Sequence, residues 1–70
     1  MHTKRWYQAR LAKYFVDNYE PYEDAAEFYP DPADNQWLFD IPELEVRIRL
    51  TCHENGMVME EQRMKGASRL

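Results

Sequence analysis

Apolar side chains recur with a helical period in the first part of the chain. Thr3 can serve as an N-cap, and the apolar residues that follow it are spaced three and four positions apart as far as Tyr19. The apolar face comprises Tyr7, Leu11, Tyr14, Phe15 and Tyr19. Trp6, Arg10, Lys13 and Asp17 fall on the opposite side. The pattern predicts an amphipathic helix over residues 3–19.

The helical pattern is interrupted at Glu20-Pro21. The residue before a proline is biased away from helical geometry, whereas a proline suits the first position of a new helix. We therefore predict a short second helix over residues 21–29, with an apolar side made of Tyr22, Ala25, Ala26 and Tyr29. Pro30 and Pro32 then indicate a loop.

From Gln36 onward the apolar period changes to two, which is typical of strands. Trp37, Phe39 and Ile41 belong to a first strand, and alternation from Leu44 to Cys52 indicates a second. Asn55-Gly56 indicates a hairpin because both residues tolerate positive φ, and the returning strand ends near Met64. The sequence is compatible with a hairpin loop of two, three or four residues. Residues 65–70 are expected to form a frayed tail.

These elements predict an α+β domain spanning residues 1–70. The N-terminal helix and the short second helix pack on a three-stranded antiparallel meander over residues 36–64. The expected core consists of Leu11, Phe15, Trp37, Phe39, Val46, Ile48 and Leu50. Since Cys52 is the only cysteine, no internal disulfide can support so small a core.

Charge is strongly segregated along the chain. The segment between Tyr14 and Val46 contains ten of the 13 carboxylates and eight of the ten aromatic residues, but no lysine or arginine. All nine basic residues lie outside it. Such segregation shapes the electrostatic field and the choice of partners. A surface that attracts a positively charged partner is therefore expected.

The predicted second helix gives this charge a pattern. Its carboxylates, spaced i, i+3, i+4 and i+7, are Glu20, Glu23, Asp24 and Glu27. They would form one stripe that docks on a basic groove, extended by Asp31 and Asp34 and flanked by Tyr22. The alternative is a solvated helix face, with acids favoured near the helix N-terminus.

Two basic or aromatic clusters also have alternative interpretations. Trp6 with Arg10, one turn further along the helix, has the composition of a binding hot spot, but Trp6 could equally fold over the core margin. Arg47 and Arg49 could contact phosphates, or pair with Glu60 and Glu61 on the next strand.

No catalytic or metal-binding motif emerges. Cys52 and His53 are adjacent on a strand, so their side chains point to opposite faces, and Cys52 is expected in the core. Asp31, Asp34 and Asn35 lack the spacing, glycine and terminal glutamate of a calcium loop. We expect no enzyme activity, no metal and no cofactor.

The sequence thus favours a small, acidic, non-enzymatic binding protein, an inhibitor or adaptor that docks on a basic site of a nucleic-acid-handling protein. Phage and mobile-element inhibitors, including anti-CRISPR proteins and other DNA mimics, are comparable in charge and size only. The alternatives are a nucleic-acid-binding module that uses the basic residues of the first helix with Arg47 and Arg49, which the net charge of −4 disfavours, and a small structural or regulatory homodimer. Without a secretory signal or an apolar span, a soluble cytoplasmic protein without membrane contact is expected.

Overall fold

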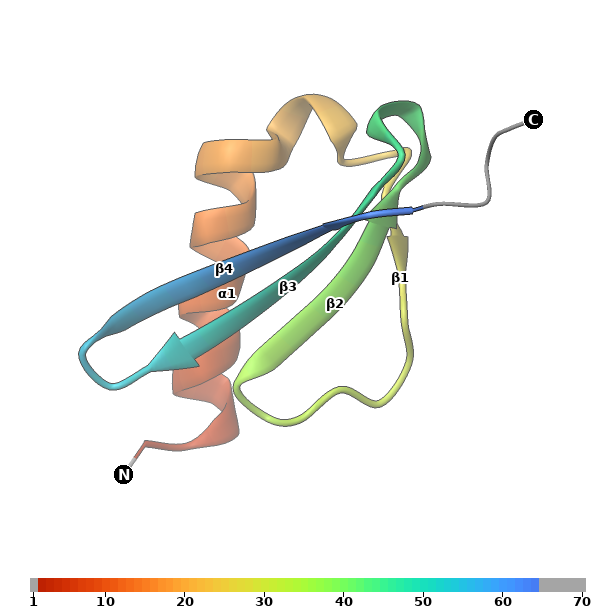
Figure 1. Ribbon diagram of the computed structural model, residues 1–70. Coiled ribbons are helices and arrows are strands. Elements are labelled where there is room, and N and C mark those ends of the chain that lie inside the picture. Colours follow the sequence, from red (N-terminus) through yellow and green to blue (C-terminus); the bar gives the residue numbers. More distant parts are fainter. Residues whose placement is uncertain (1, 65–70) are drawn as a thin grey trace.

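A computed structural model describes residues 2–64 of the chain and has one α-helix packed on one face of a four-stranded antiparallel sheet (Figure 1). The predicted α+β class is therefore confirmed. The elements follow in the order α1 (Lys4–Tyr19), the 3₁₀ turn η1 (Glu20–Tyr22), β1 (Glu27–Phe28), β2 (Gln36–Ile41), the 3₁₀ turn η2 (Pro42–Leu44), β3 (Val46–His53) and β4 (Gly56–Arg63). The predicted tail, 65–70, lies outside the described residues.

Helix α1 begins as predicted. The Thr3 hydroxyl accepts a hydrogen bond from the backbone N–H of Trp6 at 3.2 Å, which satisfies one of the unpaired amides of the first turn. Leu11 and Phe15 are buried beneath the helix, and Tyr7, Tyr14 and Tyr19 pack around them.

The predicted second helix is wrong. Tyr22 closes a single 3₁₀ turn, the chain bends at Glu23–Ala25, and Glu27–Phe28 form a fourth strand instead. β1 pairs with the end of β2, with Glu27 opposite Asp40 and Phe28 opposite Phe39. In the extended conformation Phe28 pairs with Phe39, and the centroids of their rings lie 5.0 Å apart. This contact replaces only the few backbone hydrogen bonds that a short helix would have formed. The three-stranded sheet is thereby corrected to four strands.

The strands follow one another across the sheet in the order β1-β2-β3-β4. Their helix-facing side chains form the core with α1, and the buried set is Leu11, Phe15, Phe39, Ile41, Val46, Ile48, Leu50 and Cys52. Trp37 was expected in this set but is half-buried, because its indole N–H reaches out to the Gln8 side-chain oxygen at 2.8 Å. The burial predicted for Cys52 is confirmed.

The loop of the β3–β4 hairpin has two residues, the shortest of the three lengths that the sequence allows. His53 pairs with Gly56, so Glu54 and Asn55 are the two loop residues. Gly56 follows the loop at φ 157°, whereas Asn55 does not adopt the positive φ expected of it. Positive φ among the other described residues occurs at Asp31 (55°) and Glu45 (57°).

Candidate functional site

Exposed carboxylates gather at the end of the molecule where α1 finishes. Because Glu27 pairs with Asp40 and Ile41 with Val46, the 20–27 segment and the η2 turn lie at the same end of the sheet (Figure 1). We call this the acidic end. Its six carboxylates, all exposed, are Glu20, Glu23, Asp24, Glu27, Glu43 and Glu45. Two basic residues of the described sheet lie near these carboxylates. Arg47 is bound to Asp40, and Arg63 pairs with Val46 on the neighbouring strand.

Short turns fix the backbone of the acidic end. The N–H of Glu23 donates to the carbonyl of Glu20 at 3.0 Å, and Pro21 restricts the turn between them. A 3₁₀ turn aligns residues three apart, so Glu20 and Glu23 project to the same side. In η2 the N–H of Glu45 donates to the carbonyl of Pro42 at 3.0 Å. The carboxylates are therefore carried on ordered backbone.

The acidic stripe predicted on a helix does not form as such. Glu20 and Glu23 keep a one-turn relationship, but Asp24 is in the bend and Glu27 is in β1. Tyr22, expected to flank the stripe, packs against the core. The six carboxylates share a region, and it is strand pairing that brings Glu43 and Glu45 to it. Those two residues were missed because their proximity depends on pairing between β1 and β2.

Asp31 and Asp34 do not extend the acidic end. They lie on the loop that runs from β1 to β2, away from η1. The Gln8 side-chain amide donates to the carbonyl of Asp34 at 2.9 Å, which places that loop beside the N-terminal half of α1. The structure therefore separates these two residues from the carboxylates of the acidic end.

The charges on α1 oppose its stability. Lys4 and Arg5 occupy the first turn, which has no acid, and the last turn has no basic residue but is followed by Glu20. A helix N-terminus carries partial positive charge and its C-terminus partial negative charge, so each such residue costs about 0.3–1 kcal/mol where it is exposed. The side-chain charges thus add to the helix dipole and strengthen the negative field at the acidic end.

Trp6 and Arg10, which the sequence places one helical turn apart, are in contact. The Arg10 guanidinium lies 4.2 Å from the centroid of the Trp6 ring, and the His2 ring stacks on Trp6 at 3.6 Å. Trp6 is half-buried and packs against the core, which favours its interpretation as a core-margin residue, whereas its role in a binding hot spot stays a prediction. Within residues 2–64, no ion pair involves Arg10.

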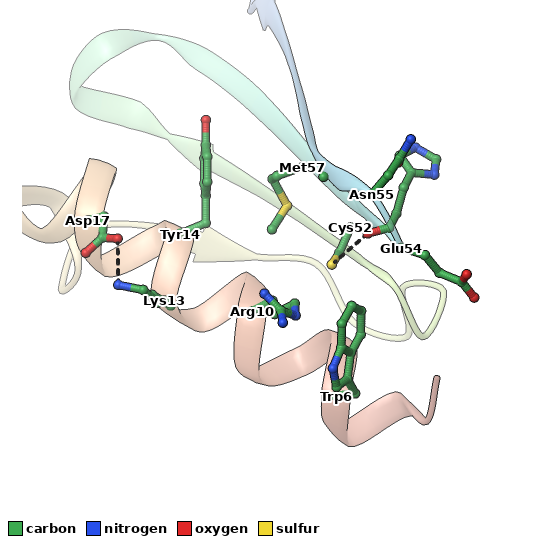
Figure 2. A pocket seen from close by; sticks show the side chains of 11 residues that line it. Trp6, Arg10, Lys13, Tyr14, Asp17, Cys52, Glu54, Asn55 and Met57 are labelled. Carbon is green, nitrogen blue, oxygen red and sulfur yellow. Dashed lines mark hydrogen bonds and ion pairs between the residues drawn. The ribbon is translucent and has the colours of Figure 1, made fainter. Parts of the chain in front are cut away.

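Arg10 and Trp6 line a groove between α1 and the β3–β4 hairpin. Figure 2 shows their side chains on the helix, across from Cys52 and Met57. The groove encloses about 390 Å³. Lys13 also lines it but is held by Asp17 at 3.1 Å. Arg10 is thus the cation of this helix face that has no carboxylate partner in the described part of the chain.

Arg47 and Arg49 lie on the sheet face away from α1 and are paired. Arg47 donates from Nε to Asp40 at 2.8 Å, and Tyr29 donates from its hydroxyl to the same carboxylate at 2.8 Å. The hydrogen bond from Arg47 holds the pKa of Asp40 below its usual value, while the bond to Asp40 raises the pKa of Tyr29. Arg49 lies 3.8 Å from Glu60. These contacts favour the cross-strand interpretation, with Asp40 rather than Glu61 as the partner of Arg47.

Cys52 is a buried free thiol, and its neighbour His53 is exposed on the other sheet face. In the described residues no group of three or more His, Cys, Asp or Glu side chains is arranged to hold a metal ion. None of the helices in that part of the chain is long and apolar enough to cross a membrane.

Comparisons of the chain with protein-family models, with curated proteins and with solved structures gave no match.

Proposed function

We propose that this is a non-enzymatic binding protein, an inhibitor or adaptor that docks its acidic end on a basic site of a nucleic-acid-handling protein. The observation that carries the proposal is the charge arrangement along α1. Basic residues stand at its positive end and carboxylates at its negative end, against the arrangement that would stabilise the helix. A feature that lowers stability without improving packing is a candidate for function.

The chemistry of the acidic end suits such a partner. Its carboxylates are exposed and lie on ordered turns and on β1, so little backbone order has to be created on docking. A protein groove that binds nucleic acid is lined with lysine and arginine and attracts repeated negative charge. Charges of this kind act over about 10 Å at 0.1 M salt, which accelerates association with a basic partner.

Direct binding to nucleic acid is the competing function. It would use Lys4, Arg5 and Arg10 on α1, because Arg47 and Arg49 are already paired with carboxylates. The net charge of −4 and the acidic end oppose the approach of a phosphate backbone.

The test is the double variant Glu20→Lys/Glu23→Lys, assayed against a basic protein such as protamine and, in parallel, against a duplex oligonucleotide, each titrated with salt. We expect the variant to bind protamine at least tenfold more weakly. Lysine at the helix C-terminus should meanwhile raise the midpoint of thermal unfolding, because it favours the helix dipole. Loss of binding in a more stable protein cannot be due to misfolding.

A matched pair of single variants controls for net charge. Glu23→Lys and Asp34→Lys change the charge equally at exposed positions, but only Glu23 lies at the acidic end. Equal weakening by both would show that only total charge matters and would contradict the proposed docking site. Oligonucleotide binding that is lost in Arg10→Glu would favour the competing function.

A further inference from the structure

Strand β4 is an exposed sheet edge. It pairs with β3 along its whole length, and its other side has no neighbouring strand in the described chain. Seven of its eight residues are exposed, on both sheet faces, and only Met57 is half-buried. Val58 and Met59 are exposed by 45% and 40%. An edge of this length with apolar side chains is a site for strand addition.

The backbone of β4 is oriented for such an addition. A two-residue loop closes on a hydrogen-bonded pair, here His53 and Gly56, and the alternate residues then point their N–H and C=O groups outward. The hydrogen bond from the N–H of Met64 to the carbonyl of Glu45, at 2.9 Å, follows the same alternation at the far end. Met57, Met59 and Glu61 therefore present donors and acceptors to solvent.

Two of the usual protections of a sheet edge are missing from β4, although it carries the charged residues Glu60, Glu61 and Arg63. β4 contains no proline or lysine, and its register with β3 runs without a bulge from Arg63 to Gly56. We propose that two copies of this chain pair through β4, antiparallel and about a two-fold axis at Met59, to form a continuous eight-stranded sheet. This goes beyond the proposed function, because it uses a surface distinct from the acidic end.

Symmetry and charge select this register. A two-fold axis perpendicular to the sheet places a residue opposite its own copy and keeps every side chain on its face. An axis at Glu60 or Glu61 would oppose two carboxylates directly, which is destabilising. An axis at Val58 would pair only the five residues 56–60, whereas an axis at Met59 pairs the seven residues 56–62.

The same register supplies the carboxylate that Arg10 lacks. Met57 would lie opposite Glu61 of the partner subunit, on the side of the sheet that faces α1. Met57 lines the groove with Trp6 and Arg10 (Figure 2). Glu61 of the partner subunit would therefore enter the mouth of that groove, and the two-fold axis repeats the contact. The side chain of Glu60 would lie opposite Val58 of the partner subunit rather than directly opposite a like charge.

The first experiment measures the mass of the full chain by sedimentation equilibrium over a wide concentration range. We expect twice the 8.5 kDa of one chain at high concentration. Met59→Lys puts two like charges on the axis and should raise the dissociation constant at least tenfold. The control Val58→Lys adds the same charge on the same strand but opposite Glu60 of the partner subunit, so it should keep the dimer. Circular dichroism confirms folding of both variants.

Disulfide cross-linking tests the register. Met59→Cys should form a covalent dimer under mild oxidation, because the two positions face each other across the axis. Glu61→Cys should not, because its neighbour is Met57 of the partner subunit. A chain that stays monomeric at all concentrations would overturn the proposal and leave β4 open to a strand of another protein. A dimer that is insensitive to Met59→Lys, or cross-linking through Glu61→Cys instead, would overturn it too.

Discussion

Strands β3 and β4 have the same length and form one hairpin, yet they differ in burial. Every residue of one pairs with a residue of the other, and both have eight residues. In β3 the helix-facing side chains are all buried, whereas in β4 the residues opposite them are exposed or, at Met57, half-buried. Helix α1 packs mainly on β2 and β3. Backbone pairing thus places a residue in the sheet, but the opposite layer decides whether its side chain is buried.

The largest expected difference between the two strands is at Ile48 and Glu61, which face each other on the helix side. Ile48→Ala should lower the free energy of unfolding by about 2–5 kcal/mol, because Ile48 is 1% exposed and leaves a cavity. In the monomer, at protein concentrations below dimerisation, Glu61→Ala should change it by less than about 0.5 kcal/mol, as for an ordinary surface site. Urea denaturation of both variants checks the comparison. Similar losses would mean that β4 is covered by the protein's own fold.

The connection between the strands gives an intermediate effect. Gly56→Val should cost about 1–2 kcal/mol, because a β-branched residue is strained at φ 157°. A Cβ at this position meets no atom within 4 Å, so the cost should come from the backbone alone. Gly56→Ala should therefore retain a large part of the loss seen with valine. Thermal unfolding that is unchanged in both variants would contradict a strained turn.

The smallest expected difference concerns the outer-face ion pairs. Asp40 is 13% exposed and receives two hydrogen bonds, whereas Glu60 is 63% exposed and lies 3.8 Å from Arg49. Asp40→Asn should cost about 1 kcal/mol, and Glu60→Gln close to zero. Denaturation midpoints of the two variants at neutral pH measure this difference.

The pH dependence of Asp40 gives a second measurement. Hydrogen bonding by Arg47 lowers the pKa of Asp40 in the folded protein below its usual value of 3.8. The stability that Asp40 contributes is therefore complete above that usual pKa and is lost as the pH falls through the lowered one. Below about pH 4 the wild type should lose its advantage over Asp40→Asn. An advantage that does not change between pH 7 and pH 2 would contradict the lowered pKa.

Most of the regular structure could be predicted from the sequence because the residues repeat with clear periods. Thr3 and the apolar positions up to Tyr19 define α1, and strict alternation defines β3. β1 was missed because it has two residues, too few for a period, and because Glu27 also fits a helical spacing with the carboxylates before it. Tyr29 before Pro30 was an available signal, since a residue before proline favours extended geometry.

The candidate site could be predicted only in part. Helical spacing within α1 was sufficient to bring Arg10 onto Trp6. The acidic end depends on contacts between segments, because Glu43 reaches the neighbourhood of Glu20 only through the pairing of β1 with β2. Long-range pairing of this kind leaves no local pattern in the sequence.

The order of the strands also bears on how fast the chain folds. Each strand pairs with the next one along the chain, so every ladder closes a short loop. Folding rates rise as the sequence separation of contacting residues falls. The main long-range step is the docking of α1 on β3, which joins Leu11 and Phe15 to Ile48 and Leu50. We therefore expect the hairpins to form early, and the docking of α1 to limit the rate.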